Sequence, residues 1–95
     1  MFGDHIVYRV HAIRRMFERA ISEAHVRGAL TSGETIEDYP TELPYPSRLI
    51  LGRTGGFPLH VVAAYNIADD QTIVITAYRP DASRWSADFR RRSSP

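Results

Sequence analysis

The chain has 95 residues, contains no cysteine, and carries a formal net charge of +1 from 12 arginines and 11 acidic side chains. This length supports one hydrophobic core, and the missing cysteines exclude disulfide bonds, thiolate nucleophiles and cysteine-based zinc sites. No apolar run approaches the ~20 residues that a membrane helix needs, and no signal peptide is recognisable, so we expect a single cytoplasmic domain over residues 1–95 with no membrane segment.

The first third of the sequence predicts two helices joined by a short link. Residues 4–10 form either a lead-in strand or an extended arm. From His11 onward, apolar side chains fall on one broad arc at about 100° per residue, as an amphipathic helix requires. These side chains are Ala12, Ile13, Met16, Phe17 and Ala20. Ser22 is a suitable N-cap for a second helix to about Ser32, which Gly33 ends. Because the link is only a residue or two, we expect a helical hairpin.

After the helices, the period of the apolar pattern changes to two, which is typical of strands. The segments with this pattern are 34–39, 48–53, 59–65 and 72–78. Short links between successive strands favour antiparallel neighbours, and strands that follow helices indicate an α+β fold. We therefore expect an N-terminal helical hairpin packed on one face of a four-stranded antiparallel sheet. The core of the domain would span about 8–85, and a basic tail would follow at 86–95.

The most suggestive polar group lies on the first predicted helix. His11, Arg15 and Arg19 are spaced i, i+4 and i+8, so one imidazole and two guanidinium groups lie along a single flank. Two guanidinium groups one turn apart can hold a phosphate while the imidazole titrates near neutral pH. The alternative is that these arginines lie over the sheet edge or pair with acidic neighbours such as Glu18, as surface charges at helical spacing commonly do.

Further candidates lie within the predicted strands or at their ends. His60 interrupts an apolar strand, where it is either a satisfied structural group or a catalytic one. Arg53 ends a strand beside a glycine-rich loop, while Tyr78 and Arg79 end the last strand, and functional residues gather at such positions. Tyr78 also fits as a core residue with its hydroxyl group at the surface. The arginine run at residues 90–92 fits a solvated tail or a phosphate contact.

Metal and cofactor chemistry has no clear signal in the sequence. Any metal site would rest on scattered histidines without acidic partners nearby in the pattern, so we expect no metal ion. No phosphate-cradling loop, nucleophile elbow or dinucleotide fingerprint is present, so we expect no other cofactor. The exclusive use of arginine suits phosphate recognition, although a GC-rich genome produces the same bias.

An ordered set of motifs over residues 8–85 resembles the family called domain of unknown function 4258. The motifs are His11-Ala12-x-x-Arg15-Met16-x-x-Arg19, Gly33-Glu34-x-Ile36-Glu37-x-Tyr39-Pro40, Leu51-Gly52-Arg53, Pro58-Leu59-His60-Val61-Val62 and Val74-Ile75-Thr76-Ala77-Tyr78-x-Pro80-Asp81. The layout of this family is similar to the RelE-like toxins, particularly BrnT and MqsR, which are metal-independent endoribonucleases held inactive by an antitoxin. The resemblance thus implies a single RelE-like domain that acts as the toxin of a type II toxin–antitoxin pair.

The resemblance also implies roles for the polar residues. In such a nuclease a base takes the proton of the ribose 2′-hydroxyl group, cationic groups stabilise the phosphorane, and an acid protonates the leaving 5′-oxygen. The implied catalytic residues are His11, His60, Arg15, Arg53 and Tyr78. The implied substrate-binding residues are Arg19 and Arg79. We expect His11, Arg15, Arg53 and His60 to converge on one cleft.

The expected partners are RNA and a cognate antitoxin, for which the resemblance suggests a zinc-binding protein of the YgiT/MqsA type. Ile13 and Phe17 are apolar where such helices more often carry polar residues, which indicates a surface that a partner covers. The rival hypothesis is a non-catalytic protein- or nucleic-acid-binding module with the same fold. A third alternative is a family member that keeps the fold and has lost its activity.

Overall fold

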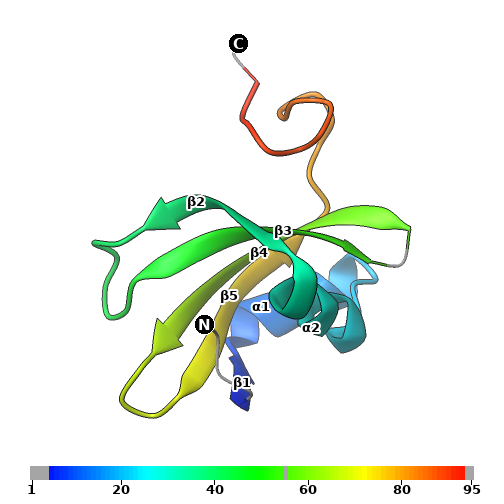
Figure 1. Ribbon diagram of the computed structural model, residues 1–95. Coiled ribbons are helices and arrows are strands. Elements are labelled where there is room, and N and C mark those ends of the chain that lie inside the picture. The colour runs from blue at the N-terminus through cyan, green and yellow to red at the C-terminus, as the bar shows by residue number, and fades with distance from the viewer. Residues whose placement is uncertain (1–4, 55, 94–95) are drawn as a thin grey trace.

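The computed structural model describes residues 5–54 and 56–93, and within them the strands form one mixed sheet of five strands (Figure 1). The elements in chain order are β1 (His5–Tyr8), α1 (Val10–Glu18), α2 (Glu23–Ser32), β2 (Glu34–Tyr39), β3 (Ser47–Thr54), β4 (Phe57–Asn66) and β5 (Gln71–Tyr78). The order of strands across the sheet is β1-β5-β4-β3-β2. The neighbours from β2 to β5 are antiparallel, and the segments expected to form strands do so.

The expected four-stranded antiparallel sheet is wrong because β1 adds a fifth, parallel strand. His5 lies opposite Gln71, and Tyr8 lies opposite Val74. A four-residue segment with two adjacent apolar residues fits a strand and an extended arm equally well. Its partner is the last strand in the sequence, and no local pattern reveals so distant a pairing.

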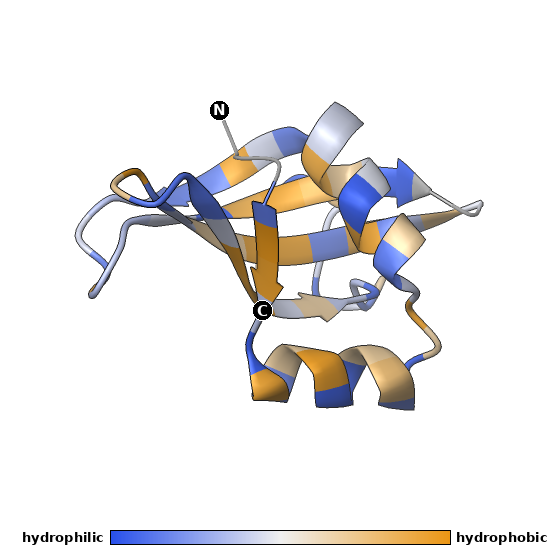
Figure 2. Ribbon diagram, turned by 90° about the horizontal axis from the view of Figure 1, so that it is seen from below, coloured by the Kyte–Doolittle hydropathy of each residue, from blue (hydrophilic) through white to orange (hydrophobic). Residues whose placement is uncertain are grey.

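The expected N-terminal helical hairpin is also wrong. β1 precedes both helices, and each helix packs on the sheet: α1 covers β5, whereas α2 covers β3 and β4. Figure 2 shows α1 and α2 crossing the same side of the sheet at different places. Ala20 has a positive φ of 54° in the link between them, and this turn redirects the chain so that α2 approaches other strands. A short link therefore did not guarantee that the helices pair.

The core lies between the helices and one face of the sheet. Its buried residues are Ala12, Met16, Ile21, Val26, Ala29, Ile50, Leu59, Val61, Ala63, Val74 and Ala77. Successive strand residues point to opposite faces. Since Leu59 and Val61 face the helices, His60 between them faces the other side of the sheet. This alternation fixes where the polar cluster described below is built.

The helix termini follow the sequence in part. Ser22 caps α2 as expected: its hydroxyl oxygen accepts a hydrogen bond from the His25 amide, and the His25 ring accepts one from the Ser22 amide. By contrast, Arg9 precedes α1 without a side-chain cap. Among the described residues, no helix is long and apolar enough to cross a membrane.

The second face of the sheet is crossed by residues 81–93, which we call the strap. Figure 1 shows this segment, in orange and red, on the side of the sheet opposite α1 and α2. A bridge between Trp85 and Arg92 closes the strap on itself, and the Ser93 amide donates to the Arg84 carbonyl oxygen at 2.8 Å. Trp85 is buried against the sheet. The strap is thus packed on the domain along with the helices.

Candidate functional site

An open pocket of about 320 Å³ lies at the end of β5. Its lining residues are Arg19, Tyr78, Arg79, Asp81, Arg84, Trp85 and Arg92. The pocket contains four arginines against one carboxylate, so its electrostatic potential favours an anion. Its volume lies at the lower end of the range of small-molecule sites.

The position of the pocket follows from the short length of β1. β1 pairs with β5 only from Gln71 to Val74, so it leaves the later part of β5 without a strand on that side. The chain after α1 lies along this stretch, and Arg19 donates a hydrogen bond to the Ala77 carbonyl oxygen at 3.3 Å. The strap begins just beyond β5 and supplies the remaining wall. The pocket is therefore formed by α1, β5 and the strap together.

Three of the pocket arginines are in no close ion pair, although the charge of Arg84 acts with hydrogen bonds from Ser83 to lower the pKa of Asp81. Within the part of the chain that the structure describes, no ion pair involves Arg19, Arg79 or Arg84. The guanidinium group of Arg79 lies 4.1 Å from the centre of the Phe57 ring, which holds this side chain by a cation–π contact. These charges are available to an external anion.

Arg92 is the pocket arginine that forms an ion pair with a carboxylate of the same chain. Its Nε donates to Oε2 of Glu37 at 3.0 Å, and its Nη2 donates to Oε1 at 3.2 Å. The guanidinium group also lies 4.8 Å from the centre of the Trp85 ring. Burial acts to raise the pKa of Glu37, but hydrogen bonds from Arg92 and Tyr39 outweigh it and lower that pKa. Glu37 is therefore ionised at neutral pH.

Tyr78 connects the pocket to a buried histidine. His60 lies directly opposite Tyr78 on β4, and its Nδ1 is 3.2 Å from the Tyr78 hydroxyl oxygen. Its Nε2 is 2.9 Å from the Phe89 carbonyl oxygen. Because a carbonyl oxygen only accepts, we assign the proton to Nε2, so that Nδ1 accepts from the Tyr78 hydroxyl group.

Burial sets the ionisation of this pair. It lowers the pKa of His60 below 6.5, although the hydrogen bond to Phe89 acts in the opposite direction. Burial also raises the pKa of Tyr78 above 10.0. The Trp85 ring packs against the imidazole edge to face, with 4.4 Å between ring centres. At neutral pH both side chains are thus uncharged.

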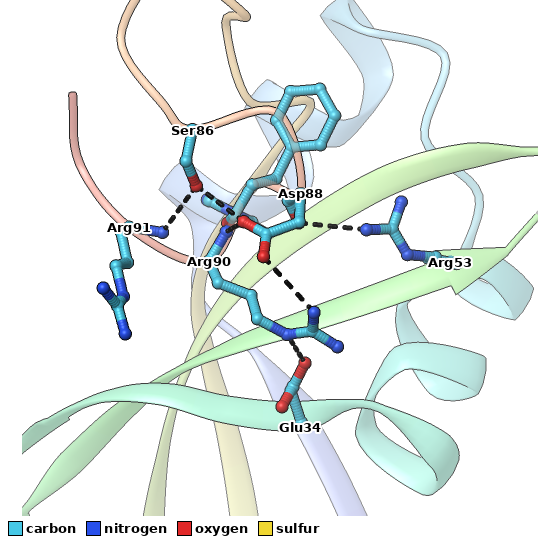
Figure 3. A network of polar contacts seen from close by, with 8 residues as sticks. Glu34, Arg53, Ser86, Asp88, Arg90 and Arg91 are labelled. Atoms are coloured by element: carbon cyan, nitrogen blue, oxygen red, sulfur yellow. Dashed lines mark hydrogen bonds and ion pairs between the residues drawn. The ribbon is translucent and has the colours of Figure 1, made fainter.

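Four of the residues predicted from the sequence line the pocket or contact a residue that does, and the other three lie elsewhere. Arg19, Tyr78 and Arg79 line the pocket, and His60 contacts one of them. His11 and Arg15 lie on α1, where Arg15 forms an ion pair with Glu18 at 3.8 Å. The side chain of Arg53 instead donates to the Asp88 carbonyl oxygen at 2.9 Å, as Figure 3 shows.

The four residues expected to share one cleft are therefore not brought together. α1 lies on the helix-covered face of the sheet, whereas His60 points to the face that the strap covers. The sequence did not assign Arg84 or Arg92 to the site: Arg92 belongs to an arginine run that resembles a solvated tail, and Arg84 belongs to no recognisable motif. Two acidic residues on β2 are the sequence signal that could have indicated a packed tail. Glu34 forms an ion pair with Arg90, and Glu37 forms one with Arg92.

Two further features bear on function: the metal-ligating side chains and the exposed surface of α1. Across residues 5–54 and 56–93, no group of three or more histidine or acidic side chains is placed to hold a metal ion. On α1, Ile13 is 55% exposed and Phe17 is 88% exposed, so the expectation of an exposed apolar surface there is confirmed. Val10 extends this row along the same helix, since it is 72% exposed.

Comparison with known proteins gives one match. The model of a family described as "Domain of unknown function (DUF4258)" matches residues 8–79. Nothing matches among curated proteins or among solved structures. The matched region contains Arg19, Tyr78 and Arg79, while the strap residues of the pocket lie beyond it. These comparisons give no support to the expected likeness to RelE-like toxins.

Proposed function

Because the chain belongs to the family described as "Domain of unknown function (DUF4258)", and that description names no activity, we propose its function from the pocket: the protein binds single-stranded RNA there. The observation that carries this proposal is the group of guanidinium groups from Arg19, Arg79 and Arg84 around one open cavity, of which Arg19 and Arg79 each donate one hydrogen bond to a backbone carbonyl oxygen. Forked guanidinium donors match the oxygen atoms of a phosphodiester.

The chemistry around the pocket favours a single-stranded nucleic acid over a free phosphate ion. Proteins that bind single strands combine cationic side chains with aromatic rings, and here Arg79 lies over Phe57 while Tyr78 lines the cavity. The net charge of +1 is too small to attract nucleic acid over the whole surface, so recognition depends on this local cluster. We choose RNA over DNA because the sequence motifs resemble a family that is expected to be similar to RNA-cleaving toxins.

Binding is tested by fluorescence anisotropy with a fluorescein-labelled single-stranded RNA of about 12 nucleotides in about 0.1 M salt. Replacing Arg79→Ala should weaken binding about tenfold, because it removes one charge-assisted phosphate contact. Arg14→Ala is the matched control: it removes the same charge from an exposed position on α1 outside the pocket. Equal losses in the two variants, or no RNA binding by the wild type, would contradict the proposal.

A second candidate function is metal-independent cleavage of the bound RNA, and the Tyr78–His60 hydrogen bond favours it. The ribose 2′-oxygen would attack the adjacent phosphorus and the bond to the 5′-oxygen would break, which leaves a 2′,3′-cyclic phosphate and a 5′-hydroxyl group. The 2′-hydroxyl proton would pass to the Tyr78 oxygen as Tyr78 gives its own proton to Nδ1 of His60. Water would protonate the leaving oxygen, the hydroxide ion left behind would take the proton from His60 through Tyr78, and the arginines would stabilise the phosphorane.

Cleavage is tested separately from binding with Tyr78→Phe. This variant keeps the ring and removes the hydroxyl group, so RNA affinity should stay within about twofold while cleavage falls about 10²-fold. Products are separated on a denaturing gel, and added EDTA should leave the wild-type rate unchanged. If the wild type releases no cyclic-phosphate product, the cleavage candidate is excluded and the protein is a binding module.

The proposal extends to a protein partner that covers α1, as an antitoxin would. The apolar row of Val10, Ile13 and Phe17 is exposed, and arginines at positions 9 and 14 flank it. A second copy of the chain would bring these positive charges face to face, so charge complementarity favours a different protein with an acidic, amphipathic segment. Such a partner supports the assignment to a toxin–antitoxin pair.

A further inference from the structure

Arg92 belongs to two sets of contacts at once. It lines the pocket, and it is held by both carboxylate oxygens of Glu37 from β2. We propose that Glu37 is an internal competitor for the pocket's anion: it occupies the guanidinium group that an RNA phosphate would otherwise bind, so RNA must displace Glu37 from Arg92. This inference depends on the proposed RNA-binding function and identifies how that same site is regulated.

The geometry of the pair resembles a phosphate contact. Two parallel N–H donors of Arg92 meet two oxygens of one carboxylate, which is the arrangement that guanidinium groups also form with phosphate. Glu37 is only partly exposed, with 25% of its side chain accessible, and its Oε1 also accepts a hydrogen bond from the Tyr39 hydroxyl group. The carboxylate is therefore held by a second contact, whereas the Arg92 side chain is the more exposed of the two.

Exchange of partners is feasible because Arg92 is open to solvent. Its side chain is 63% exposed, and ion pairs at such exposed positions contribute little in water. The cation–π contact with Trp85 keeps the guanidinium group beside the pocket whichever anion it binds. A phosphate that is also held by Arg19, Arg79 and Arg84 has three further cations in its favour.

A neighbouring ion pair provides an internal comparison. Glu34, also on β2, pairs with Arg90 of the strap, but Arg90 does not line the pocket at the end of β5. Figure 3 shows that Arg90, Asp88 and Arg53 hold the tip of the strap beside β2 and β3, away from that pocket. Displacement of Glu37 would therefore release one end of the strap while its tip stays anchored.

The decisive experiment compares Glu37→Gln with Glu34→Gln. Each removes one negative charge from β2 and replaces one ion pair with the strap by at most a neutral hydrogen bond, yet only Glu37→Gln weakens the hold on a pocket arginine. RNA affinity should rise about fivefold in Glu37→Gln and less than about twofold in Glu34→Gln. Circular dichroism checks that both variants are folded. Equal affinities in the two variants would overturn the inference.

A double substitution separates competition for Arg92 from a general charge effect. Arg92→Gln alone should weaken RNA binding, and adding Glu37→Gln to it should give no gain, because the freed guanidinium group is then missing. A gain of equal size in the Arg92→Gln background would mean that Glu37 acts only through its charge, which contradicts the competition.

A second readout keeps the test independent of RNA. The sequence contains one tryptophan, Trp85, which contacts Arg92, so its fluorescence reports the exchange. Inorganic pyrophosphate should change this emission in the wild type, and at about fivefold lower concentration in Glu37→Gln. If RNA fails to bind but pyrophosphate behaves as described, the RNA proposal fails and the competition stands. If pyrophosphate has the same effect in both proteins, the competition fails.

Discussion

The imidazole of His60 is fully buried, and three separate segments meet at this one side chain. β4 supplies the histidine, β5 supplies the Tyr78 hydroxyl group, and the strap supplies the Phe89 carbonyl oxygen. A buried polar group left without a partner costs about 1–3 kcal/mol. Since both ring nitrogens depend on partners from elsewhere in the chain, this residue fixes the position of the strap on the sheet.

The stability of the protein should fall as the pH falls below 6.5. Burial lowers the pKa of His60 in the folded state, so below 6.5 the unfolded chain binds the proton more tightly. The stabilisation is complete above 6.5 and is lost progressively as the pH falls towards the folded pKa. Urea unfolding measured in steps from about pH 8 to about pH 5.5 tests this.

The control for this prediction is His60→Gln, which has no ionisable group at this position. The fall in unfolding free energy over this pH range should be smaller in the variant than in the wild type. If the variant does not fold, the imidazole resonance of His60 in the wild type should titrate below 6.5 by NMR. A midpoint above that value would contradict the assignment.

At the residue level, the sequence identified several pocket residues but not their grouping. Arg19, Tyr78 and Arg79 were selected because they end a helix flank or a strand, and the three line one pocket. His11 was selected with Arg19 from their common helix flank, yet it does not line that pocket. Spacing along a helix shows which side chains share a flank, but the orientation of the helix on the sheet decides which of them reach a site.

At the scale of elements, α2 and β3 approach each other closely at Gly52. A β-carbon added at Gly52 would lie 2.7 Å from Cα of Ala29 and closer still to its Cβ. Glycine therefore allows the helix to lie directly against the strand at this point. The local sequence of β3 does not show why glycine is needed at this position. The reason is the close contact with Ala29 of α2, more than twenty residues earlier in the chain.

Replacing Gly52→Ala should destabilise the protein by about 1–3 kcal/mol, because α2 must move away from β3 to make room. The measurement is urea unfolding followed by circular dichroism. Ala29→Gly in the same molecule removes one of the two overlapping carbons, so the double variant should recover part of the loss. A fully additive loss would show that the contact is not the cause.

The outer surface of α1 should matter for association and hardly at all for folding. Phe17 is 88% exposed, so Phe17→Ser should change the free energy of unfolding by less than about 0.5 kcal/mol. Binding of an acidic, amphipathic protein partner should weaken about tenfold or more, as measured by calorimetry with the product of the neighbouring gene. Glu18→Ser on the same helix is the control, and an equal effect there would contradict a role for the apolar row.

Sequence patterns located most elements correctly, since each carries its own periodicity. The alternation at 34–39, for example, coincides with β2, and Ser22 caps α2. Sequence patterns did not predict the pairing of β1 with β5 or the separation of α1 from α2. Both are decided by contacts between residues far apart in the sequence, which periodicity does not record.

At the scale of the whole molecule, the sheet is covered on both sides by different means. The helices bury the larger apolar core on one face, whereas the strap crosses the other face with polar contacts, ion pairs and Trp85 over a smaller apolar surface that includes Leu49 and Leu51. The pocket lies where these two layers meet beside β5. A change in the strap therefore reaches the pocket without disturbing the apolar core.

Ile6 of β1 tests how late the sheet is completed during folding. Its side chain packs against the core, and Ile6→Ala should cost about 1–2 kcal/mol. Because the pairing of β1 with β5 closes a very long loop, it should form after the main folding barrier. Stopped-flow measurements should show faster unfolding and a nearly unchanged folding rate. A slowed folding rate would place β1 in the folding nucleus instead.

The parallel pairing of β1 also has a consequence for the protein during translation. β1 leaves the ribosome before every other strand, but its hydrogen-bonding partner β5 is synthesised after all of them. Until then, the backbone of β1 lacks its native partner, and one edge of the growing sheet is incomplete. The nascent chain cannot reach its native topology until Tyr78 has emerged, so in the cell, completion of the domain depends on synthesis of the last strand.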